Sequence, residues 1–162
     1  MFRIGTGWDI HRLVSSPEGK LIIGGICIES KVSPIAHSDG DVLLHALTDA
    51  LLGATALGDI GSHFPDTDSH YKNADSLSLL KETVNIILSE YHDLEIQNID
   101  CTVILQTPKL APYIDSIRQN IAEALNIDKK AVSVKAKTAE KILGELGLGL
   151  AVEAQVSVLI SI

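Results

Sequence analysis

Apolar and polar residues alternate along several short segments of the chain, a pattern typical of strands with one buried face. The clearest segment begins at Val152, from which every second residue up to Ile162 is apolar. Similar alternation predicts strands over Ile99–Leu105 and Val132–Ala136, and an Ile-rich run predicts another over Lys20–Ile28.

Three other segments carry apolar residues at helical spacing. We expect the first helix to begin at a cap formed by Ser38 or Asp39 and to end near Leu57. It is apolar almost all round, which predicts burial on more than one side. A second helix is expected over Asp75–Tyr91, and a third has Pro112 in its first turn.

The order of these elements predicts the fold class. Strands and helices interleave along the chain, and no internal repeat or low-complexity segment interrupts them. We expect an α+β fold, in which a mixed β-sheet has its helices packed mainly on one face. A chain of 162 residues has the usual size of one domain, so we expect a single domain over residues 1–162.

Composition narrows the possible partners and location. There are 21 acidic and 13 basic residues, and the net charge of −8 argues against a general nucleic-acid binder. Cys27 and Cys101 lie too far apart for a metal-binding pair and indicate a reducing compartment. We find no secretory signal and no apolar run long enough to span a membrane, so we expect a cytoplasmic protein without membrane contact.

Residues that commonly bind zinc form one candidate cluster. Asp9 and His11 share a face of a segment that reads as extended, and His45 lies in the middle of the most apolar helix. Asp41 and Asp49 stand four residues to either side of His45 and can orient its second ring nitrogen. Separately, these residues also fit a surface pair and an ordinary core histidine. Together they predict a zinc site with three protein ligands and one open position, as in catalytic centres.

Two further segments can contact phosphate. His37 and Ser38 precede the long apolar helix, whose N-terminus favours anions. Lys135–Lys141 leaves a predicted strand and is expected to enter a helical turn, where Thr138 can meet phosphate and Glu140 can bind a hard cation such as Mg²⁺. A helix cap and a solvated strand end are the plainer interpretations.

Together these residues resemble the 2-C-methyl-D-erythritol 2,4-cyclodiphosphate synthase family of the non-mevalonate pathway of isoprenoid (terpenoid) biosynthesis. The resemblance covers nearly the whole chain. Its most specific stretches are Arg3–Arg12, Ala36–Ala46, Gly58–Gly61 and Phe64–Asp68.

The resemblance implies a lyase that works as a homotrimer with active sites between adjacent subunits. It implies that 4-diphosphocytidyl-2-C-methyl-D-erythritol 2-phosphate is converted to the cyclic diphosphate and CMP. It also implies a zinc ion on Asp9, His11 and His45, and a second cation, Mg²⁺ or Mn²⁺, at Glu140. His37 and Thr138 match the groups that stabilise the transition state.

The remaining site residues also follow from the resemblance. Those that match the methylerythritol site are Ser38, Asp59, Ile60 and Gly61. Those that match the loop closing over the substrate are Phe64, Pro65, Asp66, Thr67 and Asp68. Those that match the cytidine pocket are Leu105, Pro108, Lys109, Leu110, Ala111, Ala136 and Lys137.

The chain departs from the family pattern at residues 143–150, where many members carry an arginine. We therefore carry over neither that arginine's phosphate contact nor an isoprenoid diphosphate site on the trimer axis.

Two alternative functions use the same candidate ligands. The first is a zinc-dependent phosphoester hydrolase with Asp49 or Asp66 as its base, which would yield an open diphosphate. The second is a non-catalytic trimeric zinc- and nucleotide-binding module, which would need a fourth ligand such as His63 or His70.

Overall fold

The computed structural model describes residues 1–68, 71 and 73–162. Its strands are β1 (Phe2–Ser15), β2 (Lys20–Ile23), β3 (Ile26–Glu29), β4 (Val32–Pro34), β5 (Glu95–Leu105), β6 (Val132–Lys137) and β7 (Ala151–Ser161). Its α-helices are α1 (Val42–Thr55), α2 (Ile60–His63), α3 (Ser76–Glu90) and α4 (Ile114–Leu125), with short 3₁₀ turns at Ala111–Tyr113 and Lys129–Ala131.

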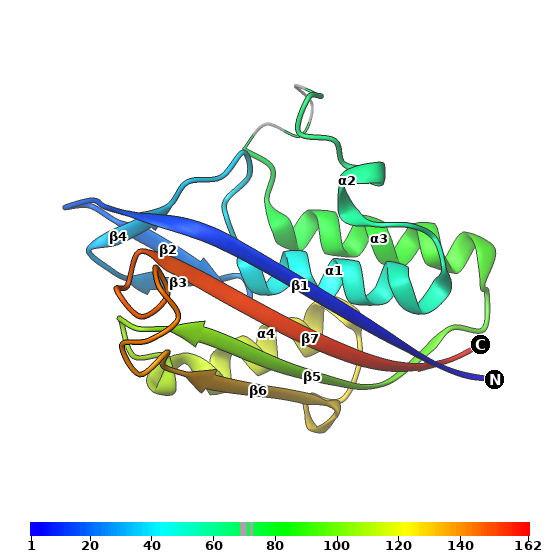
Figure 1. Cartoon of the computed structure of the whole chain (residues 1–162). Coiled ribbons are helices and arrows are strands. Elements are labelled where there is room, and N and C mark those ends of the chain that lie inside the picture. The colour runs from blue at the N-terminus through cyan, green and yellow to red at the C-terminus, as the bar shows by residue number, and fades with distance from the viewer. Residues whose placement is uncertain (69–70, 72) are drawn as a thin grey trace.

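One five-stranded sheet runs through the molecule in the order β4-β1-β7-β5-β6 (Figure 1). The central strand β7 is antiparallel to both β1 and β5, whereas β5 and β6 are parallel. The predicted mixed sheet is therefore confirmed. Strands β2 and β3 form a separate two-stranded sheet.

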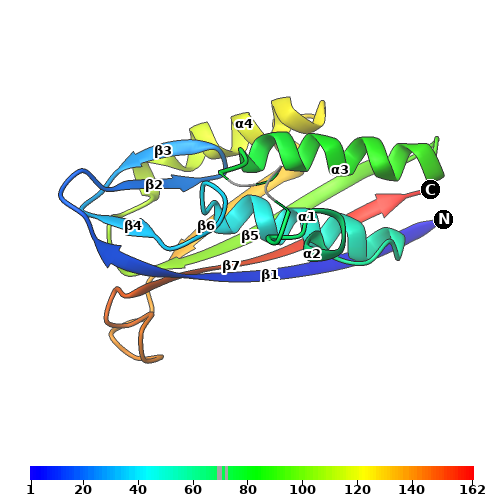
Figure 2. The same cartoon turned by 90° about the horizontal axis from the view of Figure 1, so that it is seen from above.

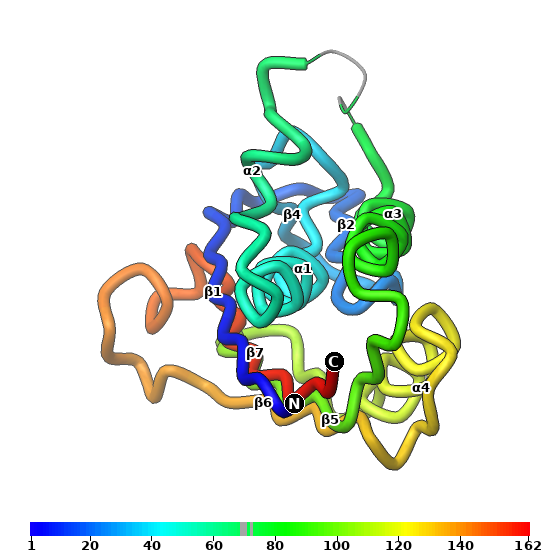
Figure 3. Tube along the Cα trace, turned by 90° about the vertical axis from the view of Figure 1, so that its right-hand side faces the viewer, coloured from blue at the N-terminus to red at the C-terminus, as the bar shows by residue number. Residues whose placement is uncertain are grey.

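Helices α1, α3 and α4 lie on the same face of the large sheet (Figures 2 and 3). The alternating apolar residues of β5 and β7 point into this layer and belong to the main hydrophobic core, while Ala139, Leu146 and Ala151 form a small second cluster. The predicted α+β class with helices on one face is confirmed. Among the described helices, none has the length and apolar content needed to cross a bilayer.

Strand β1 lies unusually close to helix α1. A Cβ atom at Gly5 would lie 1.8 Å from the carbonyl oxygen of Ala50, and one at Gly7 would lie 1.9 Å from that of Ala46. Only glycine permits such contact between a strand and a helix backbone. Gly5 and Gly7 thus allow β1 and α1 to pack together.

Three local predictions were wrong. The expected strand over Lys20–Ile28 is a hairpin, because Gly24 and Gly25 adopt positive φ angles (61° and 74°) and form its turn. The cap of α1 is Asp41, which accepts the backbone N–H groups of Leu43 and Leu44, rather than Ser38 or Asp39.

The third error concerns the segment after β6. It forms turns instead of a helical turn, and Glu140 and Lys141 adopt positive φ angles of 50° and 62°.

Candidate active site

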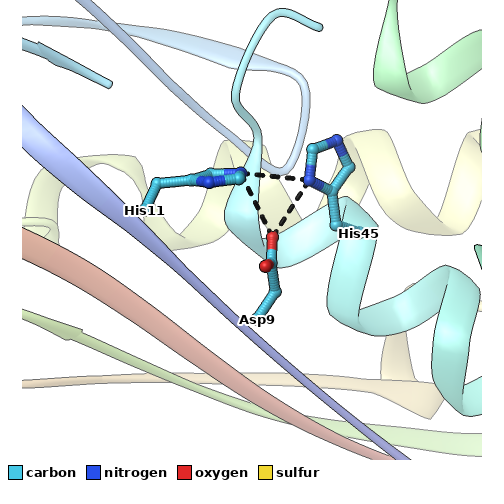
Figure 4. A group of neighbouring side chains, drawn as sticks. All are labelled: Asp9, His11 and His45. Carbon is cyan, nitrogen blue, oxygen red and sulfur yellow. Dashed lines mark hydrogen bonds and ion pairs between the residues drawn. The ribbon is translucent and has the colours of Figure 1, made fainter. Parts of the chain in front are cut away.

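Three side chains from two elements converge at one point (Figure 4). Asp9 and His11 project from β1 toward α1, and His45 projects from α1 toward them. The distance from His45 Nδ1 to Asp9 Oδ2 is 3.0 Å, and that from His11 Nε2 to His45 Nδ1 is 3.1 Å. His11 Nε2 and Asp9 Oδ2 lie 3.2 Å apart. The predicted cluster is therefore brought together.

This arrangement fits a metal ion. Each of the three residues offers one ligand atom, and these atoms lie within 4.8 Å of one another, close enough to bind the same ion. Donor atoms bound to a tetrahedral zinc ion lie roughly 3.3 Å apart, given bond lengths of about 2.0–2.1 Å. The observed separations of 3.0–3.2 Å need only a slight expansion.

The electrostatic setting differs between the two histidines. Burial is the largest influence on His11 and lowers its pKa, although the charge of Asp9 opposes this. Burial also disfavours protonation of His45, but the hydrogen bond and charge of Asp9 outweigh it and raise the pKa of His45. The neutral imidazole is the form that binds a metal, and the lowered pKa of His11 favours this form.

The second ring nitrogen of His45 contacts two hydroxyl groups. Its Nε2 lies 3.1 Å from Ser38 Oγ and 2.9 Å from Ser76 Oγ. The prediction that Asp41 or Asp49 orients this nitrogen was wrong, because both carboxylates bind backbone amides elsewhere. Asp49 accepts the N–H of Ile60, at 2.7 Å.

A cavity of about 390 Å³ opens above the cluster. Its lining residues are His11, Ala36, His37, Ser38, His45, Ile60, Gly61, Phe64, Pro65, Asp66, Tyr71 and Leu79. Most residues matched to the methylerythritol site and its closing loop are therefore gathered here. His37 and Asp66 face each other across 3.9 Å at its exposed edge.

Three predicted residues of this region do not line the cavity. Asp59 caps α2 by accepting the N–H of Ser62, and Thr67 and Asp68 lie on the exposed loop that follows Asp66. His63, an alternative fourth ligand, forms a 2.8 Å hydrogen bond to the carbonyl of Leu57. His70 lies outside the described residues.

The residues matched to the cytidine pocket form a second group. Because β5 and β6 are parallel, with Ile104 paired to Lys137, the segments that follow both strands lie at the same end of the sheet (Figure 1). The segment that carries Pro108 and Lys109 thus leaves the sheet at the same end as Thr138, whose hydroxyl donates to Glu140. Leu105 and Leu110 are buried.

The metal-cluster cavity and the residues matched to the cytidine pocket lie apart within one chain. The metal-ligand strand β1 and the edge strand β6 are separated by β7 and β5. Three strand spacings correspond to roughly 14 Å. The cavity above His45 is lined by residues between 11 and 79, whereas the second group begins at residue 105.

Three residues of the site had no signal in the sequence: Tyr71 and Leu79 line the cavity, and Ser76 contacts His45. Ser76, Tyr71 and Leu79 reach the site from the start of α3 and the segment before it. Their position depends on how α3 docks against α1, which no local pattern reveals.

Fold and site together define a class: an α+β protein in which one strand of a mixed sheet and the central helix place an Asp–His–His cluster at the base of a cavity. The model of the YgbB family matches residues 2–161.

Two curated relatives extend this result. The 2-C-methyl-D-erythritol 2,4-cyclodiphosphate synthase of Alkaliphilus oremlandii is 53% identical over 94% of each chain. The bifunctional enzyme IspD/IspF of Albidiferax ferrireducens is 55% identical over 98% of this chain, which spans only 37% of that protein.

A solved structure agrees with them. The CDP complex of IspF from Plasmodium falciparum has a TM-score of 0.83 and 35% identity, and covers 98% of this chain and 95% of its own. This chain belongs to the YgbB family of 2-C-methyl-D-erythritol 2,4-cyclodiphosphate synthases, which are lyases of isoprenoid biosynthesis.

Proposed function

We propose that the protein converts 4-diphosphocytidyl-2-C-methyl-D-erythritol 2-phosphate to 2-C-methyl-D-erythritol 2,4-cyclodiphosphate and CMP. The observation that carries this proposal is the convergence of Asp9, His11 and His45 at the base of a cavity, in a chain of this family. In the reaction, an oxygen of the 2-phosphate forms a bond to the β-phosphorus. The bond from the β-phosphorus to the bridging oxygen breaks, and CMP leaves.

The chain need not supply a nucleophile, because both reacting groups belong to the substrate. Its task is to fold the substrate so that the two phosphates meet, an effect worth up to about 7–11 kcal/mol in ideal cases. A zinc ion held by Asp9, His11 and His45 would act as a Lewis acid on a phosphoryl oxygen. Among the described residues no fourth ligand joins this cluster, which supports an open position.

The cavity supplies the substrate contacts in this proposal. His37 stands at its edge with its imidazole exposed, so it can donate a hydrogen bond to a phosphoryl oxygen as charge develops. Ser38, Ile60 and Gly61 line the part expected to hold methylerythritol, beside Asp59 at the start of α2. The segment from Phe64 through Pro65, Asp66 and Thr67 to Asp68 would cover it.

The group at the ends of β5 and β6 supplies the nucleotide contacts. We assign the cytidine to Leu105, Pro108, Lys109, Leu110, Ala111, Ala136 and Lys137. Thr138 would stabilise the transition state, and the exposed Glu140 carboxylate would hold Mg²⁺ or Mn²⁺ at the diphosphate. The CDP bound to the Plasmodium falciparum relative supports a nucleotide ligand.

We propose a homotrimer with each active site between two subunits. One support is the separation of the two groups by two strands, which a neighbouring subunit can bridge. A second is the uncovered face of β1, where Phe2, Ile4 and Trp8 are 69%, 73% and 55% exposed. Large exposed apolar residues gathered on one face mark interaction surfaces.

Phosphorus NMR of the purified protein with the cytidyl substrate, zinc and magnesium tests this function. We expect the cyclic diphosphate and CMP from the wild type, no turnover from His45→Ala, and normal turnover from His92→Ala. His92 is an exposed histidine whose ring lies 2.8 Å from the Leu88 carbonyl at the end of α3. An open diphosphate would instead indicate a hydrolase, and zinc binding without turnover would indicate a binding module.

A further inference from the structure

The hydroxyl of Ser76 occupies an unusual place for the first residue of a helix. Ser76 opens α3, but it is Asp75 that caps the helix, accepting the N–H of Ser78. Ser76 is 1% exposed, and its Oγ lies 2.9 Å from His45 Nε2. Ser76 therefore contacts the ring nitrogen of His45 that points away from Asp9 and His11.

Asp39 holds Ser76 at two points. One carboxylate oxygen accepts the Ser76 hydroxyl, and the other accepts its backbone N–H at 3.1 Å. Backbone bonds fix the same junction, because Asp39 N–H donates to the Ala74 carbonyl and Asn73 N–H donates to that of His37. The start of α3 is thus tied to the segment before α1.

The hydrogen bonds that link Asp39, Ser76 and His45 can run in only one direction. A carboxylate can only accept, so the Ser76 proton points to Asp39 and the Ser76 oxygen is left to accept from His45 Nε2. With a proton on Nε2, the imidazole presents its lone pair at Nδ1. That atom faces Asp9 Oδ2 and His11 Nε2.

We propose that Ser76, oriented by Asp39, is a positioning residue that holds His45 in the tautomer and ring orientation needed to bind a metal through Nδ1. Ser38 also lies 3.1 Å from Nε2, but its Oγ accepts the Gly40 N–H, and among the described residues no carboxylate bonds it. Ser38 therefore contacts His45 without setting the direction of its proton. Partners of this kind are worth about 10–100-fold in metal affinity.

This inference rests on the proposed metal site, and zinc binding tests it without substrate or turnover. Zinc affinity of the metal-free protein is measured by competition with a chromophoric chelator for the wild type, Ser76→Ala, Ser76→Thr and Asp39→Asn. Ser78→Ala is the matched control, because Ser78 is an exposed serine in the same helical turn that bonds Asp75. The spectrum of the cobalt-substituted protein reports the ligand geometry.

We expect Ser76→Ala and Asp39→Asn to bind zinc about 10–100-fold more weakly, with altered cobalt spectra. Ser76→Thr, which keeps the hydroxyl, should recover most of the affinity, and Ser78→Ala should stay within twofold of the wild type. Tight wild-type binding that Ser76→Ala leaves unchanged would overturn this inference alone. Failure of the wild type to bind zinc would overturn the proposed metal site as well.

A second measurement needs no variant. Nitrogen-15 NMR of the zinc-bound wild type identifies which ring nitrogen of His45 carries the proton. We expect the proton on Nε2 and the metal on Nδ1; the reverse assignment would overturn the inference.

Discussion

Replacing Gly7 by alanine should separate β1 from α1 and damage the metal cluster. The added Cβ would lie 1.9 Å from the Ala46 carbonyl oxygen and 2.8 Å from the Ala50 nitrogen, and real Cβ contacts essentially never fall below 3.0 Å. Both opposing atoms belong to the helix backbone, so no side chain can move aside. The strand must therefore retreat from the helix by at least about 1.1 Å.

This displacement can be compared with what the site tolerates. Asp9 and His11 follow Gly7 on β1, whereas His45 lies on α1. Metal–ligand distances are held to within about 0.2 Å, so a shift of about 1 Å should lower zinc affinity by at least ~100-fold. Overpacking of this kind costs about 1–3 kcal/mol or more, which corresponds to a melting temperature lower by roughly 2–12 °C.

Gly53→Ala is the matched control. Gly53 is an exposed glycine of α1 whose added Cβ would meet only the Thr6 carbonyl oxygen, at 3.8 Å. Alanine is the better helix former there, by about 0.5–1 kcal/mol. Calorimetry and chelator competition should therefore show Gly53→Ala melting higher with unchanged zinc affinity. Wild-type zinc affinity in Gly7→Ala would refute the argument that glycine-mediated contact aligns the ligands.

Three further predictions concern buried groups. Burial raises the pKa of Asp41 to about 6 against 3.8 for the free residue, despite four backbone donors, so its contribution to stability is full below pH 3.8 and is lost as pH rises through 6. In denaturant unfolding of the metal-free protein, wild-type stability relative to Asp41→Asn should thus fall by about 2 kcal/mol from pH 4 to pH 7; a pH-independent difference would contradict this. Thr83 is fully buried, and within the described chain its hydroxyl has no partner, so Thr83→Val should raise unfolding stability by about 1 kcal/mol; a loss would show that the hydroxyl is satisfied. Burial raises the pKa of the Cys101 thiol to about 12, whereas Cys27 is exposed, so a thiol reagent should label one cysteine per native chain and two in denaturant.

Sequence periodicity was most informative where a segment has one buried face. The strands at Ile99 and Val152 were predicted because their inward residues alternate strictly with polar ones. Strand β1 was less evident, because apolar residues such as Ile4 and Trp8 also occupy its exposed face. The hairpin turn at Gly24–Gly25 did have a local signal, since paired glycines favour such turns.

The site itself was only partly accessible from the sequence. Asp9 and His11 could be paired because residues two apart share a face of a strand, and His45 stood out in an apolar helix. The partners of each carboxylate could not be predicted in this way. Ser38, Asp39 and Asp41 are all good helix caps, and the choice of Asp41 depends on the backbone amides of a hairpin that lies far away in the sequence.

Asp39, Asp41 and Asp49 all lie near His45 in the sequence, but each has a separate structural role. Helical spacing places Asp41 and Asp49 on the same face of α1 as His45. Asp41 accepts the amides of Gly24 and Gly25 and holds the β2–β3 hairpin against α1. Asp49 accepts the amide of Ile60 and holds the start of α2, and Asp39 holds the start of α3. Helices α2 and α3 each contribute residues to the cavity lining. Helix α1 and its preceding turn therefore supply a metal ligand and also attach two walls of the cavity, because Asp39 and Asp49 satisfy backbone donors at the beginning of α3 and α2.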